Sequence, residues 1–143
     1  MLKAVFESTV IVSALLTPSG LAGALIKRAK AGDFVLILSQ EIIDEARATL
    51  RTHQKLRKKY RYSDEEVAYF FSGLRQTVSL VSDLPSIQVV RDPNDDFIIA
   101  TAIKAGADYL VAWDKDLLTI GTYQNISILT PEAFLQLLNT TDG

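Results

Sequence analysis

The chain has 143 residues, close to the roughly 150 expected of one domain. Its 15 Lys and Arg against 17 Asp and Glu give a net charge of −2. Cysteine is absent and there is one histidine, which excludes disulfides, thiolate zinc sites and a cysteine nucleophile. We therefore expect a single domain, residues 1–143, in the cytoplasm. Because the net charge is close to zero, any nucleic-acid binding has to use a local basic patch.

The N-terminal segment has some features of a secretory signal. Lys3 precedes an apolar stretch that continues to Leu16. Glu7 interrupts this stretch, whereas the apolar region of a signal is normally continuous. The sequence also has no run of 18 apolar residues, the length associated with a membrane span. We expect neither a cleaved leader nor a membrane segment.

Short apolar runs alternate with helical patterns along the chain. The predicted strands cover residues 2–6, 34–38, 109–112 and 126–129, with one more at either 77–81 or 87–90. The predicted helices cover 8–16, 19–31, 39–50, 63–74 and 95–105, and a last one begins at 130. The stretch 53–62 is basic and poorly patterned. Continuous apolar strands separated by helices indicate a parallel sheet with helices on both faces.

Capping residues support several of these boundaries. Ser39 precedes one helical pattern, and Ser63 with Glu66 has the spacing of a capping box. Gly32 is well placed to end the helix over 19–31, because glycine tolerates the left-handed conformation that follows many helices. Thr130 and the proline after it fit the start of the final helix.

Carboxylates follow the predicted strands in four separate segments. They are Glu7, Glu45, the group Asp92, Asp95 and Asp96, and the pair Asp114 and Asp116. Right-handed crossovers bring the carboxyl ends of parallel strands to one edge of the sheet, and sites in open α/β folds form at that edge. We therefore expect these side chains to lie together.

Most of these carboxylates also have a purely structural interpretation. Asp95 or Asp96 can cap the helix that follows, and Glu45 can be a solvated residue on a helix face. The pair after the strand at 109–112 can form a turn. Glu7 is different, because it stands between an apolar strand and an apolar helix, and a buried Glu is rare unless it is paired.

A cluster of carboxylates needs a compensating cation. Neighbouring carboxylates raise one another's pKa values, and Arg91 and Lys115 are the only basic residues in the strand-end segments. Oxygen-only ligands favour Mg²⁺ or Mn²⁺ over zinc. Such ions polarise a phosphoryl oxygen and generate a hydroxide nucleophile. The residues therefore indicate phosphodiester hydrolysis.

The strongest charge cluster is a basic segment with tyrosines between its charges. The predicted RNA-binding residues in it are Lys55, Arg57, Lys58, Lys59 and Arg61. Basic side chains neutralise phosphates, and tyrosines such as Tyr60 and Tyr62 can stack on bases. A solvated connector without a ligand is the alternative.

The acidic segments resemble those of a known family. The strings VFESTVIVSALL, SQEIIDEARATL, DPNDDFIIATA and LVAWDKDLL are similar in order and spacing to those of PIN-domain (PilT N-terminal) proteins, in particular bacterial toxins of toxin–antitoxin pairs. The resemblance covers nearly the whole chain. It implies a three-layer α/β/α sandwich with a central parallel sheet of about five strands. It also implies a Mg²⁺- or Mn²⁺-dependent endoribonuclease, frequently a homodimer, that a small antitoxin protein inhibits.

The same resemblance assigns roles to the acidic residues. The implied catalytic residues are Glu7, Glu45, Asp95, Asp114 and Asp116. Glu7, Asp95 and Asp114 are expected to bind a first metal ion directly. Glu45 and Asp116 are expected to act through water or to hold a second ion. Thr9 is expected to orient Glu7 or a metal-bound water.

Three positions depart from the family's usual strings. Glu7 stands where Asp is usual, Thr9 where Asn is usual, and Ala112-Trp113 where Thr-Gly or Thr-Asn is usual. A side chain one methylene longer moves a carboxylate by about 1.5 Å, and Mg²⁺ is strict about its geometry. The alternative is therefore a weakened or inactive PIN-fold module that binds RNA or an antitoxin. A receiver-like phosphoacceptor domain would need a lysine after a late strand that reaches the phosphoryl group. It fits less well, because Lys115 is adjacent to Asp114 rather than opposite it.

Overall fold

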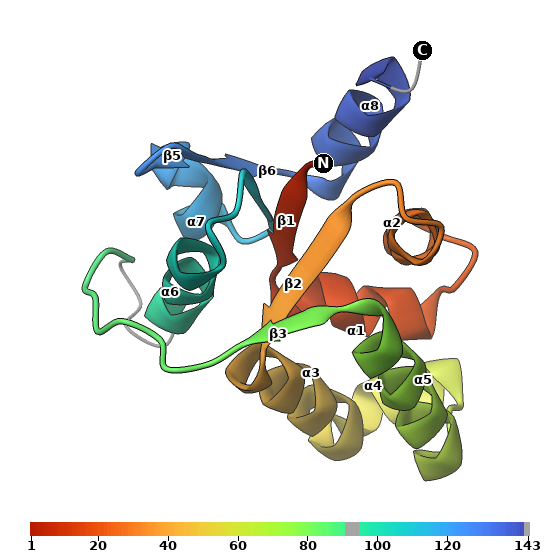
Figure 1. The fold of residues 1–143 in the computed structure, drawn as a ribbon. Coiled ribbons are helices and arrows are strands. Elements are labelled where there is room, and N and C mark those ends of the chain that lie inside the picture. Colours follow the sequence, from red (N-terminus) through yellow and green to blue (C-terminus); the bar gives the residue numbers. More distant parts are fainter. Residues whose placement is uncertain (91–94, 142–143) are drawn as a thin grey trace.

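One six-stranded sheet forms the centre of the computed structural model, which describes residues 1–90 and 95–141 (Figure 1). In the order of the sheet, the strands are β3 (Ser79–Val81), β2 (Val35–Ser39), β1 (Lys3–Phe6), β4 (Tyr109–Val111), β6 (Ile126–Leu129) and β5 (Thr122–Tyr123). Neighbouring strands are parallel except β5 and β6. The carboxyl ends of β1, β2 and β4 therefore share one edge of the sheet.

Helices flank this sheet on both sides. In chain order, the helices of the described residues are α1 (Ser8–Leu16), α2 (Leu21–Lys30), α3 (Gln40–Thr52), α4 (Gln54–Tyr60), α5 (Asp64–Thr77), α6 (Asp96–Ala105), α7 (Lys115–Ile120) and α8 (Pro131–Thr141). Figure 1 shows α6 and α7 on one side of the sheet and α1 and α2 on the other. The predicted three-layer α/β/α fold is confirmed.

Strand β1 is apolar from Ala4 to Phe6 because both faces of the sheet are covered there. Ala4, Val5 and Phe6 of β1 have no exposed surface. The ring of Phe6 packs against Phe34, with 5.8 Å between the ring centroids, and against Phe134 of α8 at 6.1 Å. Phe34 and Phe134 are in edge contact at 5.0 Å. These aromatic contacts attach the C-terminal helix to the start of β2 and to β1.

The caps predicted at Ser39, Ser63 and Thr130 are present in the structure. The hydroxyl of Thr130 accepts a hydrogen bond from the backbone N–H of Ala133, at 3.1 Å, at the start of α8. The hydroxyl of Ser39 accepts a hydrogen bond from the backbone N–H of Ile42, at 3.3 Å, at the start of α3. Ser63 and Glu66 form the complete capping box at the start of α5. Gly32 follows α2 with a φ of +83°, a conformation that glycine adopts without steric penalty.

Three elements differ from the sequence-based expectation. Residues 54–60 form helix α4, which the nitrogen of the His53 side chain caps by accepting from the N–H of Leu56 at 3.4 Å. Helix α7 and strand β5 were not predicted. β5 forms a hairpin with β6 through Gln124 and Asn125, whose φ values of 47° and 68° are those of a tight type I′ turn. The strand left open between two positions is Ser79–Val81.

No single helix among the described residues has the length and apolar composition to cross a membrane. Only α1 and α2 taken together reach that length and composition, and the two are bent by 99° relative to each other.

Candidate functional site

Glu7 lies at the carboxyl end of β1, directly before α1, and only 3% of its surface is exposed. Its Oε1 accepts a hydrogen bond from the hydroxyl of Thr9 at 2.6 Å. Its Oε2 accepts from the backbone N–H groups of Trp113 at 2.6 Å and of Asp114 at 3.0 Å. The side chain therefore connects the end of β1 to the segment that follows β4.

The environment of Glu7 disfavours its charge. Burial raises the pKa of Glu7 above the usual 4.5, and the neighbouring Asp114 carboxylate raises it further. The hydrogen bonds from Thr9, Asp114 and Trp113 act in the opposite direction without reversing the shift. Two carboxylates that interact in a buried place create a position where a cation is stabilised.

Asp114 begins helix α7. Its Oδ1 accepts hydrogen bonds from the backbone N–H groups of Asp116, at 2.8 Å, and Leu117, at 3.2 Å. Within the described part of the chain, the second oxygen, Oδ2, has no hydrogen-bond partner. Asp114 thus caps a helix instead of forming the expected turn, and its other oxygen is not used in the cap.

Glu45 is a half-buried residue of α3, and its carboxylate accepts a hydrogen bond from the hydroxyl of Ser8. Ser8 is itself buried, at 5% exposure, and is the residue that follows Glu7. The contact therefore ties α3 to the start of α1 beside the buried carboxylate. The interpretation of Glu45 as a merely solvated residue is wrong.

The two aspartates at the start of α6 have different roles. Asp96 is 9% exposed, and its Oδ1 accepts from the backbone N–H groups of Val89 at 2.9 Å and Val90 at 2.7 Å. It therefore anchors the segment that leads toward α6. Asp95 is half-buried at the N-cap position, and its side chain does not cap the helix. Asp92, a further predicted edge carboxylate, lies outside the described residues.

The predicted convergence of carboxylates is observed for Glu7 and Asp114. In residues 1–90 and 95–141, no three Asp, Glu or His side chains form a group that could hold a metal ion. The physical reason is that each side chain is directed to protein donors: Glu7 to three, Asp114 to two N–H groups and Glu45 to a hydroxyl. Without a cation, bonding to these donors is more favourable than bringing like charges together.

The donor chemistry of the Glu7–Asp114 pair nevertheless fits a hard divalent cation. Both ligands are carboxylate oxygens, which Mg²⁺ and Mn²⁺ prefer. The pKa of Glu7 is raised mainly by burial and also by the Asp114 carboxylate, and Asp114 retains one oxygen outside its cap. Asp116, half-buried in the first turn of α7, follows Asp114 by two residues.

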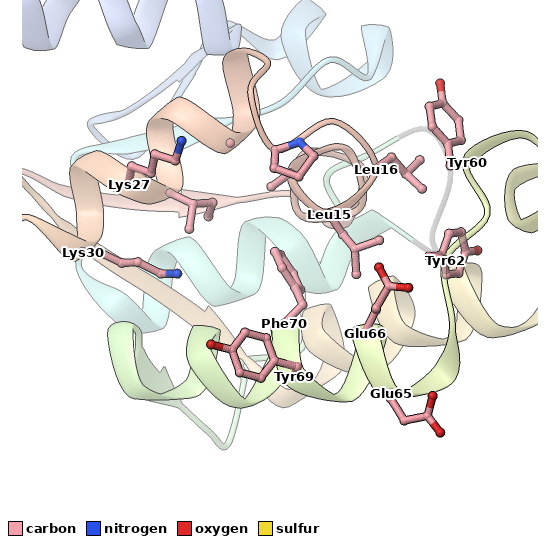
Figure 2. A pocket seen from close by; sticks show the side chains of 14 residues that line it. Leu15, Leu16, Lys27, Lys30, Tyr60, Tyr62, Glu65, Glu66, Tyr69 and Phe70 are labelled. Atoms are coloured by element: carbon pink, nitrogen blue, oxygen red, sulfur yellow. The ribbon is translucent and has the colours of Figure 1, made fainter.

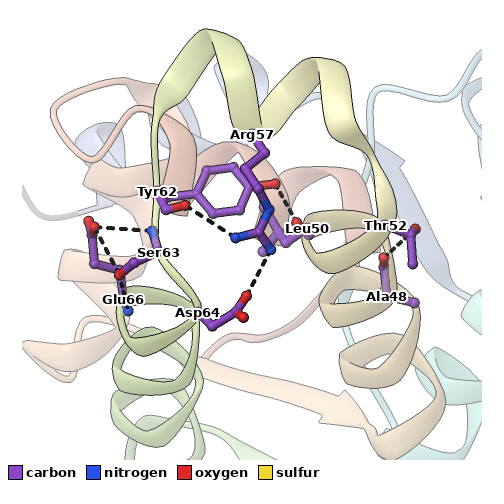
Figure 3. Close-up of polar contacts among 8 residues, drawn as sticks. All are labelled: Ala48, Leu50, Thr52, Arg57, Tyr62, Ser63, Asp64 and Glu66. Carbon is purple, nitrogen blue, oxygen red and sulfur yellow. Dashed lines mark hydrogen bonds and ion pairs between the residues drawn. The ribbon is translucent and has the colours of Figure 1, made fainter.

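The basic segment divides into a structural part and an exposed part (Figure 3). The guanidinium of Arg57 donates to Asp64 at 2.8 Å and to the carbonyl of Tyr62 at 3.4 Å, and lies 5.0 Å from the centre of the Tyr62 ring. Tyr62 is 6% exposed, and its hydroxyl donates to the carbonyl of Leu50. The expectation that Tyr62 stacks on bases is therefore wrong, because this ring is buried and holds α3 to α5.

The other part of the segment is exposed. Its members are Lys55, Lys58, Lys59 and Arg61. Tyr60 is 36% exposed, and the ammonium group of Lys59 lies 5.3 Å from the centre of its ring. These side chains are accessible to an anion.

The structure also contains a cavity that the sequence does not predict. A cavity of about 710 Å³, which we call the α1–α5 groove, opens between α1, α2 and α5 (Figure 2). Its apolar wall includes Leu15, Leu16, Ile26 and Phe70. Figure 2 shows Lys27 and Lys30 on one side and Glu65 and Glu66 on the other. The groove joins residues that are far apart in the sequence, so no local pattern announces it.

The chain belongs to the PIN domain family. A family model with the description PIN domain matches residues 3–116, a range that ends on Asp116 and contains all five predicted catalytic residues. PIN domains are generally nucleases that use divalent metal ions, and they commonly bind RNA and antitoxins. No curated protein matches the chain in a sequence comparison.

The raised pKa of Glu7 predicts an unusual pH dependence of stability in the metal-free protein. Above pH 4.5 the unfolded chain loses the Glu7 proton, while the folded chain retains it until the higher folded pKa is reached. The folded state then binds more protons, so the free energy of unfolding contributed by this group falls as pH rises. Urea unfolding with EDTA, from about pH 4 to pH 8, measures this decrease.

Glu7→Gln, which is neutral at every pH, should remove this component of the pH dependence. Glu41→Gln, at an exposed position of α3, is the control and should retain it. Identical pH profiles for the wild type and Glu7→Gln would show that the burial of Glu7 does not perturb its ionisation.

Proposed function

We propose that residues 1–143 form a single cytoplasmic PIN domain that acts as a divalent-metal-dependent endoribonuclease, the toxin component of a toxin–antitoxin pair. The observation that supports this most strongly is the buried Glu7 carboxylate beside Asp114, at the edge where strands β1 and β4 end. In a family of nucleases, a buried carboxylate beside a second carboxylate at this edge is best explained as part of a cation site.

The proposal keeps the roles that the family resemblance implies for the acidic side chains. Glu7, Asp95 and Asp114 would hold the first Mg²⁺ or Mn²⁺ ion, and Glu45 and Asp116 would act through water or a second ion. When bound, such an ion polarises the phosphoryl oxygen and lowers the pKa of a bound water. Thr9 keeps the Glu7 carboxylate oriented through its 2.6 Å hydrogen bond.

The replacement of the usual Asp by Glu7 has a structural counterpart. The longer side chain lets one oxygen reach the backbone N–H groups of Trp113 and Asp114 while the other accepts from Thr9. A carboxylate held in this way has little freedom to adapt to the strict octahedral geometry of Mg²⁺. We therefore propose that Mn²⁺ supports activity better than Mg²⁺.

The alternative is a module that binds RNA or an antitoxin without cleaving RNA. The observation that favours it is that three protein donors already satisfy Glu7. A cleavage experiment separates the two proposals, because both predict binding and only one predicts hydrolysis.

The α1–α5 groove supports the antitoxin part of the proposal. An amphipathic helix binds by placing its apolar face in an apolar groove, and this cavity has an apolar wall between basic and acidic rims. Tyr69, at 84% exposure, and Tyr60, at 36%, are large exposed side chains that line it. We propose the groove as the antitoxin site. On the family resemblance alone, the proposal also includes a homodimer.

The nuclease proposal predicts internal cleavage of single-stranded RNA in the presence of Mn²⁺. Asp114→Asn should lower kcat/KM on the order of 100-fold, because it removes a charged ligand while an amide oxygen can still cap α7. Gel analysis of a labelled RNA with Mn²⁺, Mg²⁺ or EDTA measures this, and Glu41→Gln is the control. A wild type that binds RNA and leaves it intact would overturn the nuclease and leave the binding module.

The toxin proposal predicts that expression of the chain arrests bacterial growth and that the small protein encoded beside it relieves the arrest. Tyr69→Glu should abolish the relief and leave the arrest unchanged, because Tyr69 is too exposed to matter for folding. Leu80→Glu, at a 46% exposed position outside the groove, is the matched control and should still be relieved. Equal relief of both variants would remove the groove from antitoxin binding.

A further inference from the structure

Three arginines from two helices meet in a cleft that the proposed cation site does not use. The cleft has a volume of about 500 Å³ and lies between α3 and α5. Its lining consists of Arg47, Arg51, Asp64, Val67, Ala68, Ser72 and Arg75. Arg47 and Arg51 are four residues apart on α3 and so share one face of the helix, whereas Arg75 comes from the last turn of α5.

Among the described residues, no ion pair balances the positive charge of this cleft. Asp64, the acidic side chain in the lining, is already paired with Arg57 at 2.8 Å. Across residues 1–90 and 95–141, none of the three cleft arginines has an ion-pair partner. Three guanidinium groups in one concave surface form a site for an anion.

Two of the arginines are held in position by uncharged groups. The guanidinium of Arg47 lies over the Phe71 ring, 5.0 Å from its centre. Arg75 donates to the side-chain oxygen of Gln40 at 2.9 Å. Such contacts fix a guanidinium and leave its charge available, which lowers the entropy lost when an anion binds.

The cleft extends along α3, away from the edge of the sheet where the strands end. Gln40 begins α3 where β2 ends, so the contact with Arg75 lies at the edge of the sheet. The 13 residues of α3 extend for about 20 Å, past Arg47 and Arg51, to α4 with its exposed lysines. From Arg47 and Arg51 onward, beyond Asp44, which binds Gln40, this face of α3 is positively charged as far as the exposed part of the basic segment.

An anion in this cleft lies away from the proposed site of hydrolysis. Arg47 follows Glu45 by two residues, which is about 200° around a helix. Glu45 contacts α1 through Ser8, and Arg47 contacts α5 through Phe71. The cleft is thus on the face of α3 opposite to Glu45, and an anion there is separated from the carboxylates by the helix itself.

We propose that the α3–α5 cleft binds backbone phosphates of single-stranded RNA at a distance from the cleaved bond. This inference rests on the proposed ribonuclease function and adds the substrate's path to it. Guanidinium groups recognise phosphate in a bidentate manner. A polymer with regularly repeated phosphates matches positive charge that extends over the length of a helix, whereas a single small anion would occupy only one part of it.

The test is the binding of a fluorescently labelled single-stranded RNA, measured by anisotropy over a range of salt concentrations in EDTA. Each phosphate contact that is lost should lower the slope of log K against log salt by about 0.7. Arg51→Gln should lower the slope by this amount, and the double variant Arg47→Gln with Arg51→Gln by about twice as much. Affinity at low salt should fall roughly tenfold in the double variant.

Arg51→Gln carries the test without a folding complication, because Arg51 is exposed and has no hydrogen bond or ion pair with any other described residue. Lys104→Gln is the control. It removes the same charge from an exposed position in the last turn of α6, and it should leave both the affinity and the slope unchanged.

Several results would overturn the proposal. One is an unchanged slope in Arg51→Gln, and another is a wild type that does not bind RNA in EDTA. If inorganic phosphate competes as well as an equal concentration of RNA phosphate, the cleft is a site for a free anion. If polyglutamate binds with the same dependence on Arg51, it is a site for an acidic protein. The binding assay in EDTA contains no divalent ion and so does not depend on catalysis. If RNA binding depends on the arginines and the RNA is still not cleaved in a separate assay with Mn²⁺, only the nuclease proposal is contradicted.

Discussion

The hydrogen bonds from Trp113 and Asp114 to the buried carboxylate of Glu7 join the ends of two neighbouring parallel strands. β1 and β4 are paired along their backbones, and this side chain continues their connection beyond the end of the ladder. Thr9 donates to the same carboxylate from the first turn of α1. A single acidic group therefore determines how a strand end, a helix start and the segment before α7 lie together.

Other parts of the edge depend on this arrangement. Asp114, whose N–H binds Glu7, uses its own side chain to begin α7. Ser8, the neighbour of Glu7, binds Glu45 and so fixes α3 against α1. Hydrogen bonds thus connect Glu7 to the segment of Asp114, and the chain itself connects Glu7 to the Ser8–Glu45 contact. A buried carboxylate that accepts three hydrogen bonds is held rigidly, and rigidity is what a precise cation site requires.

The sequence is informative where its signals are local. Continuous apolar strands, the Ser39 cap and the Ser63–Glu66 capping box arise from contacts within a few residues, and the parallel topology then places the strand ends at one edge. The contacts of Glu7 with Trp113 and Asp114 span more than 100 residues, so no local pattern specifies them. The sequence thus predicts the location of the acidic residues and not the direction of each carboxylate.

The same limit applies to the assignment of roles to individual residues. Asp95 and Asp96 are adjacent and equally acidic, and only the approach of Val89 and Val90 makes Asp96 the anchor. Tyr62 belongs to a basic, tyrosine-containing segment typical of nucleic-acid binding, yet its contact with Leu50 buries it. The arginines of the α3–α5 cleft come from separate helices, and only packing brings them together.

The central claim is that the Glu7–Asp114 pair is part of a cation site. Calorimetric titration of Mn²⁺ into the RNA-free protein tests it most directly, with Glu7→Gln and Asp95→Asn measured beside the wild type. We predict binding to the wild type that releases protons as the buried carboxylate ionises, and an affinity reduced at least on the order of tenfold in both variants. Equal Mn²⁺ affinities in all three proteins would contradict the claim.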